Sequence, residues 1–137
     1  MWWIYALLSA LFAALTAIFA KIGIKGVDSD LATALRTSVI LIITWALVIT
    51  RGAQTGLNTL GKTNLVFICL SAMATGLSWI FYFRALQLGP VSKVASIDKL
   101  SVAIVLIFAA FFLREPLSLK TAFAASLIIC GTIIMIF

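Results

Sequence analysis

Five long apolar stretches constrain this chain more than any other feature of its sequence. They lie at about residues 2–20, 31–50, 65–83, 91–113 and 118–137, with short polar connections between them. A hydrocarbon core of about 30 Å requires roughly 20 helical residues, so each stretch is long enough to cross a bilayer. Hydrophobic residues make up 64% of the chain and charged residues only 10%, which excludes a soluble domain. The sequence therefore predicts a multi-pass integral membrane protein.

The expected fold class is all-α, with the five stretches forming one bundle and one domain over residues 1–137. Isolated strands cannot satisfy their backbone groups in lipid, and the stretches lack the alternation of a barrel strand. No basic region precedes the first stretch, so we expect a membrane helix there and not a cleaved signal. Ser29 and Asp30 are candidate N-caps for the second helix. An odd number of spans places the two termini on opposite sides of the membrane.

Residue types argue against several functions. The chain has no His, and Cys69 and Cys130 both fall inside apolar stretches, where we expect them to act as packing residues and not to bind metal. The four acidic residues are Asp28, Asp30, Asp98 and Glu115. Only Asp98 lies deep in a stretch, so we expect no enzyme activity. The net charge is +6, but the basic residues are scattered between spans, which does not favour nucleic-acid binding.

Asp98 and Lys99 are the unusual residues, because they interrupt the fourth stretch. At roughly 1.5 Å per residue, Lys99 lies about 12 Å along a helix that begins near Val91. A charge at this depth costs several kcal/mol unless it faces the bundle interior or a hydrated cavity. Neighbouring residues diverge by about 100° around a helix, so we expect each to have a partner elsewhere, with Arg36 and Arg84 as candidate cations for Asp98. The alternative is a structural pair that fixes this helix to a neighbour.

Polar side chains also follow one face of two predicted helices. On the third helix these residues are Ser71, Thr75, Ser78 and Tyr82, with Trp79 beside them. On the fourth they are Ser92, Ser96 and Lys99. Such stripes favour a polar pathway, although hydroxyl groups in membrane helices often donate to the backbone of their own helix.

The distribution of Lys and Arg is nearly even between the two sides of the membrane. The side that holds the N-terminus, side A, has Arg51, Lys62, Arg114 and Lys120. The opposite side, side B, has Lys21, Lys25, Arg84 and Lys93, together with Arg36 if that side chain snorkels. Orientation follows an excess of basic residues in cytoplasmic loops, so a near tie predicts dual topology. The alternative is that Lys21, Arg36 and Lys93 point into the protein, which would leave side A cytoplasmic.

Two segments give the chain a family resemblance. "FYFRALQLGPVSKVASIDKL" and "AFFLREPLSLKTAFAASLIICGTIIMI" resemble the closing half of an EamA-type repeat of the drug/metabolite transporter superfamily, and "ALRTSVILI" resembles an element of its first half. The matching motif positions are Tyr82, Ala85, Leu86, Leu88, Gly89, Pro90, Leu113, Glu115, Leu127, Ile128 and Gly131. The chain departs from the pattern at "DKLSVAI", which lacks the proline of many relatives, and at "FAAS", where alanine replaces glycine.

The resemblance implies a secondary transporter. Longer relatives contain two five-helix repeats of opposite orientation around a central site, so an antiparallel homodimer of this chain would restore the missing half. A heterodimer with a second five-helix protein is the alternative assembly. We expect a small polar or amphiphilic metabolite, carried across the cytoplasmic (inner) membrane by alternating access. The solute, the direction of transport and the coupling ion stay open, and an accessory membrane subunit is the alternative function, with a channel ranked last.

Seven residues are the candidates for solute binding. They are Lys99, Asp98, Trp79, Tyr82, Ser96, Ser78 and Arg36. A cavity containing Lys99 favours a carboxylate or phosphorylated solute over a bare organic cation. Trp79 and Tyr82 would supply an apolar wall with a hydrogen-bonding tip. We expect no metal and no cofactor, with proton or ion coupling as the open question.

Overall fold

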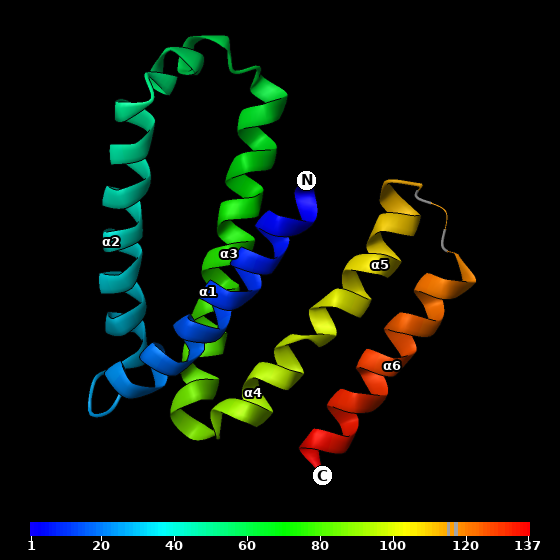
Figure 1. Ribbon diagram of the computed structural model, residues 1–137. Coiled ribbons are helices and arrows are strands. Elements are labelled where there is room, and N and C mark those ends of the chain that lie inside the picture. The colour runs from blue at the N-terminus through cyan, green and yellow to red at the C-terminus, as the bar shows by residue number, and fades with distance from the viewer. Residues whose placement is uncertain (115, 117) are drawn as a thin grey trace. The chain divides into compact units, whose positions relative to one another are not determined.

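The structure is a computed structural model that describes residues 1–114, 116 and 118–137 (Figure 1). The regular elements of these residues are all helical. They are α1 (Trp2–Gly23), α2 (Ser29–Thr50), the 3-10 helix η1 (Ala53–Thr59), α3 (Lys62–Leu88), α4 (Val91–Asp98), α5 (Leu100–Phe112) and α6 (Leu119–Ile136). Five helical segments are long and apolar enough to cross a membrane, with α4 and α5 together forming the fourth. The predicted all-helical class with five spans is therefore confirmed.

The helix ends differ from the expected ones where polar residues continue a helix. Helix α3 begins three residues before the apolar stretch and extends to Leu88, so it includes Arg84 and Gln87. Helix α2 begins at Ser29, and its N-cap is Asp28, not Ser29 or Asp30. The Asp28 carboxylate accepts hydrogen bonds from the backbone N–H groups of Asp30 at 2.9 Å and Leu31 at 3.0 Å. These bonds satisfy two donors that the first turn of a helix leaves unpaired.

The connection between α2 and α3 contains more regular structure than a solvated loop. Gly52 adopts a left-handed conformation with φ +66°, which ends α2, and η1 follows. Two threonine hydroxyls, those of Thr55 and Thr59, donate to the carbonyls of Gly52 and Gly56 at 3.2 and 2.8 Å. Both hydroxyls therefore bond to backbone carbonyls of the same connection.

The fourth span is broken at Lys99, where a single helix over residues 91–113 was expected. The N–H of Lys99 donates to the carbonyl of Ser96 at 3.1 Å, and the N–H of Val102 donates to that of Lys99 at 3.0 Å. Both bonds span three residues, so the backbone tightens between α4 and α5 (Figure 1). Neither α4 nor α5 contains a proline, so the break forms without one.

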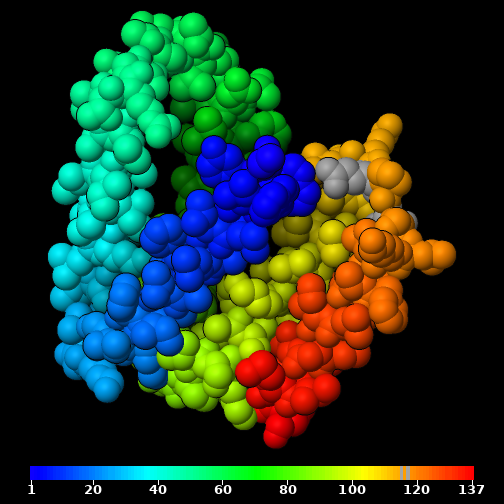
Figure 2. All heavy atoms as spheres, viewed as in Figure 1, coloured from blue at the N-terminus to red at the C-terminus, as the bar shows by residue number. Residues whose placement is uncertain are grey.

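The chain divides into two compact units. Unit 1 comprises Met1–Phe19 and Leu88–Phe137, and unit 2 comprises Ala20–Gln87. Within unit 1, α6 lies alongside α4 and α5 (Figure 2). The buried apolar side chains are Ala17, Ile24, Phe83, Leu86 and Ala103. Large apolar residues are exposed along all five spans, as expected for helices whose outer faces meet lipid or another subunit.

Candidate functional site

The candidate residues of unit 2 form an aromatic and cationic cluster between α2 and α3. The guanidinium carbon of Arg36 lies 4.2 Å from the centre of the Trp79 ring and 5.1 Å from that of Phe83. Tyr82 meets Phe83 edge to face, with ring centres 6.4 Å apart. Trp79 and Phe83 are four residues apart, so they share one face of α3. The cluster brings together three predicted residues and adds Phe83, which is 3% exposed.

The chemistry of the cluster suits an anion as well as a contact between α2 and α3. A guanidinium group stacked on a ring keeps its N–H donors in its own plane, where a carboxylate or phosphate can accept them. Within the described residues, Arg36 makes contact with rings and donates no hydrogen bond to a protein acceptor. The half-buried side chain of Trp79 supplies an apolar surface next to this charge.

The candidate residues of unit 1 gather at the break in the fourth span. The Lys99 ammonium lies 3.7 Å from a carboxylate oxygen of Asp98, so the two neighbours pair with each other, contrary to expectation. Regular helix stops at Asp98, and the long side chain of Lys99 can bend back across the turn. The side chains of Lys99 and Asp98 are 59% and 42% exposed. A charged pair thus lies inside the span Val91–Phe112, at the eighth and ninth of its 22 residues.

Ser96 links this break to α6. Its hydroxyl donates to the carbonyl of Ser92 at 2.8 Å and lies 2.9 Å from the sulfur of Met135. The hydroxyl of Thr132 lies 3.2 Å from the carbonyl of Ser96 and 2.9 Å from that of Ile128 on its own helix, so these two carbonyls share its one proton. The carbonyl of Ser96 also accepts the N–H of Lys99, so Thr132 contacts the acceptor group at which the backbone tightens. Thr132 and Met135 were not predicted, although their spacing of three places them on one face of α6.

The remaining polar residues named from the sequence do not join either cluster. The hydroxyl of Thr75 donates to the carbonyl of Ser71 on its own helix at 2.9 Å, which is the alternative given for the stripe. Ser78 is exposed on α3. Arg84 pairs with Asp30 at 3.4 Å and not with Asp98. Glu115, part of the family motif, lies outside the described residues.

Comparison with known proteins assigns the chain to a family. The model of the EamA-like transporter family matches residues 1–137. The chain belongs to the EamA-like transporter family. It is 44% identical over 134 residues to a Sinorhizobium sp. protein described as an uncharacterized transporter in the cobO 3′ region, covering 98% of this chain and 95% of that protein. No solved structure matches.

The family assignment fixes the general nature of the EamA-like chain. It is a multi-pass membrane protein of a transporter family and not an enzyme, as the sequence predicted. A transporter of this family needs polar groups within its spans to bind a small-molecule solute. Among the described residues, two clusters are candidates for this role: Arg36 with its aromatic neighbours, and Asp98 with Lys99. The described residues contain no group of three or more His, Cys, Asp or Glu side chains that could hold a metal ion.

Proposed function

We propose that the chain is a secondary transporter that moves a small polar or amphiphilic solute with an anionic group across the cytoplasmic membrane. One observation carries this proposal: the Asp98 and Lys99 side chains are about half exposed inside a membrane span, at the eighth and ninth of its 22 residues. Exposure of two charges to lipid at this depth would cost several kcal/mol. A hydrated cavity therefore covers them, and a solute can enter it.

A second subunit completes that cavity. The five spans of one chain leave most of their large apolar side chains exposed, which supports assembly with another helical subunit. We propose an antiparallel homodimer, which would supply two repeats of opposite orientation and allow alternating access around a shared site.

The positions of the basic side chains are compatible with this dimer. Lys21 and Lys93 donate to the carbonyls of Leu86 and Ile136, and Arg36 stacks on Trp79. In these contacts the three basic side chains point into the protein, which is what the alternative of a fixed topology requires. They form only after the helices have inserted, whereas the balance of Lys and Arg acts during insertion. The near tie between the two sides therefore still favours dual topology.

In the proposed mechanism, Lys99 binds the anionic group of the solute. The ammonium would exchange the carboxylate of Asp98 for that of the solute, and Asp98 would take Lys99 back when the solute leaves. This exchange occurs at the break between α4 and α5. A small change in the backbone conformation there would move both charges together. Arg36, Trp79 and Tyr82 are the second candidate surface for an organic solute.

Transport by Lys99 variants tests the proposal. A thermal-shift screen of the purified protein against amino acids, organic acids and phosphorylated metabolites first identifies a solute. Uptake of that solute into proteoliposomes is then measured for wild type, Lys99→Met and Lys99→Arg. We expect Lys99→Met to abolish uptake and Lys99→Arg to retain part of it, with similar expression and assembly. Normal uptake by Lys99→Met would show that Lys99 has only a structural role.

The mass of the purified complex separates the transporter from an accessory subunit. A homodimer with uptake activity supports the proposal. A stable complex with a different membrane protein, and no solute that shifts its unfolding temperature, would instead support an accessory subunit.

A further inference from the structure

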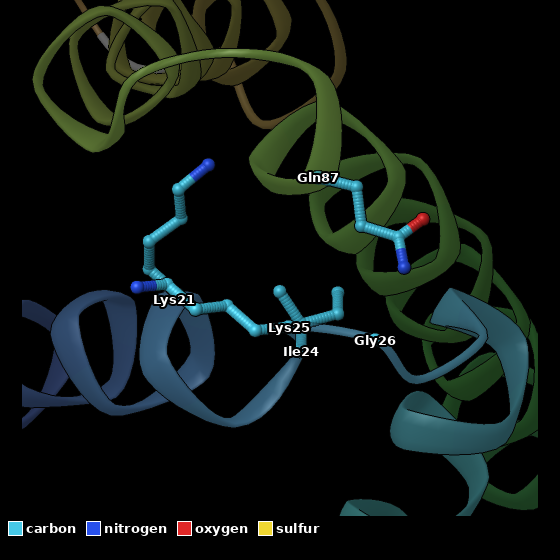
Figure 3. Close-up of a pocket in the computed structure, with 5 residues that line it drawn as sticks. All are labelled: Lys21, Ile24, Lys25, Gly26 and Gln87. Carbon is cyan, nitrogen blue, oxygen red and sulfur yellow. The ribbon is translucent and has the colours of Figure 1, made fainter.

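Unit 2 contains a pocket at the end of α1 that belongs to neither cluster described above. Its volume is about 300 Å³, and its lining residues are Lys21, Ile24, Lys25, Gly26 and Gln87. Figure 3 shows Lys21 on the last turn of α1 and Lys25 on the segment that follows, with their side chains in different directions and Gln87 across from them on α3. The lining thus combines two cations and an amide with one apolar side chain.

The two lysines have different surroundings. The ammonium group of Lys21 donates to the carbonyl of Leu86, near the end of α3, where positive charge is favourable. Lys25 has no ion pair and no hydrogen bond from its ammonium group within the described residues. Lys25 is therefore the cation of the pocket that can meet an incoming anion, while Lys21 adds to the positive potential beside it.

The acidic residues of the same connection are occupied elsewhere. Asp28 accepts the two backbone N–H groups at the start of α2. Asp30 pairs with Arg84 at 3.4 Å. Neither carboxylate lines the pocket, so the charged side chains of its lining are both cations.

The backbone around the pocket is held in place on both sides. Gly26 has φ +74°, a left-handed conformation that a side chain would strain, and it turns the chain after α1. The amide nitrogen of Gln87 donates to the carbonyl of Val27 at 2.7 Å, which attaches this turn to α3. Lys25 therefore extends from a turn that is attached to α3, and Lys21 extends from the last turn of α1.

The position of the pocket determines what it can bind. Helix α1 is a membrane span that ends at Gly23, so Lys25 and its neighbours lie near the level of the lipid headgroups. Basic pockets between membrane helices at this level suit phosphate groups. We propose that the pocket of Lys21, Lys25 and Gln87 binds a phosphate group, carried either by an anionic phospholipid or by a soluble phosphate. This binding is separate from the solute site at Lys99.

Two probes distinguish the sources of that phosphate. The full chain is placed in phosphatidylcholine nanodiscs, and its unfolding temperature is measured as phosphatidylglycerol replaces part of the lipid. In a second series the lipid stays pure phosphatidylcholine, and potassium phosphate replaces potassium chloride at equal ionic strength. Lys25→Gln removes the available cation, and Lys120→Gln is the matched control, because it removes one lysine outside the pocket.

We expect at least one probe to stabilise the wild type, with about fivefold weaker apparent affinity in Lys25→Gln and wild-type affinity in Lys120→Gln. Stabilisation by phosphatidylglycerol alone would identify a headgroup site, and stabilisation by potassium phosphate alone would identify a site for a soluble phosphate. Stabilisation by both would identify a site open to either. Equal losses in the two variants, or no stabilisation by either probe, would overturn the proposal. Solute uptake is not used as a readout, so failure here leaves the proposed transport function unaffected.

Discussion

The guanidinium group of Arg36 stacks on the indole ring of Trp79, 4.2 Å from its centre, and joins α2 to α3. Phe83 lies one helical turn further along α3, with its ring centre 5.1 Å from the guanidinium carbon. A cation inside a membrane span is thus accommodated by aromatic faces and not by a carboxylate. The contribution of Arg36 to the stability of the protein can therefore be measured separately from a role in solute binding.

A double-mutant cycle measures the Arg36–Trp79 interaction. We expect Arg36→Met and Trp79→Leu to be coupled by about 0.5–2 kcal/mol in the free energy of unfolding, the range of cation–π contacts. Unfolding in detergent micelles, followed by circular dichroism, provides the four free energies. Trp45→Leu on α2 is the control partner, and we expect its effect to add to that of Arg36→Met. Additive effects of Arg36→Met and Trp79→Leu would contradict a direct interaction.

Thr132 is predicted to stabilise the break in the fourth span. Thr132 is 4% exposed and its hydroxyl is shared between the carbonyls of Ser96 and Ile128, so Thr132→Val keeps the shape but removes this donor from both. We expect a loss of about 0.5–1.5 kcal/mol in stability. We also expect faster hydrogen exchange at the Lys99 and Val102 amides. Thr132→Ser retains the donor and should show a smaller change in exchange, whereas equal exchange in both variants would argue against this role.

Two interactions near the start of α2 can be compared by their contribution to stability: the N-cap of Asp28 and the ion pair of Asp30 with Arg84. Asp28→Ala removes two hydrogen bonds to backbone N–H groups, so we expect a loss of about 1 kcal/mol in the free energy of unfolding. Arg84→Gln breaks the pair with Asp30, whose side chains are 57% and 56% exposed, and we expect less than about 0.5 kcal/mol. Unfolding of both variants under the same conditions checks the order. The reverse order would mean that the ion pair is shielded from water.

The length and apolarity of the five spans could be predicted from the sequence, because the bilayer sets both. The break at Lys99 could not, since no proline or glycine marks it and its donor, Thr132, is distant in the sequence. Arg36 and Trp79 were both candidates, but their pairing depends on how α2 meets α3. Phe83 looked like any other apolar residue of a membrane helix, and only its contact with Arg36 distinguishes it.

The near tie of basic residues predicts a topology that a few charges can shift. A reporter fused to the C-terminus, with one version active only in the cytoplasm and another only outside it, should give signal from both sides for the wild type. Arg51→Gln combined with Lys62→Gln removes two of the four basic residues of side A and leaves side B unchanged. Because Lys and Arg near the span ends set orientation, the double variant should place side B in the cytoplasm in most molecules.

The matched control for topology is the addition of acidic residues, which contribute little to orientation. Gln54→Glu combined with Asn58→Glu changes the net charge of the same connection by the same amount as the loss of Arg51 and Lys62. We expect both reporters to stay active in this control. Signal from one side only in the wild type would exclude an antiparallel homodimer, because its two copies must insert in opposite directions. The remaining route to a two-repeat transporter would then be a partner chain of opposite orientation, and the mass of the purified complex would differ from twice that of this chain.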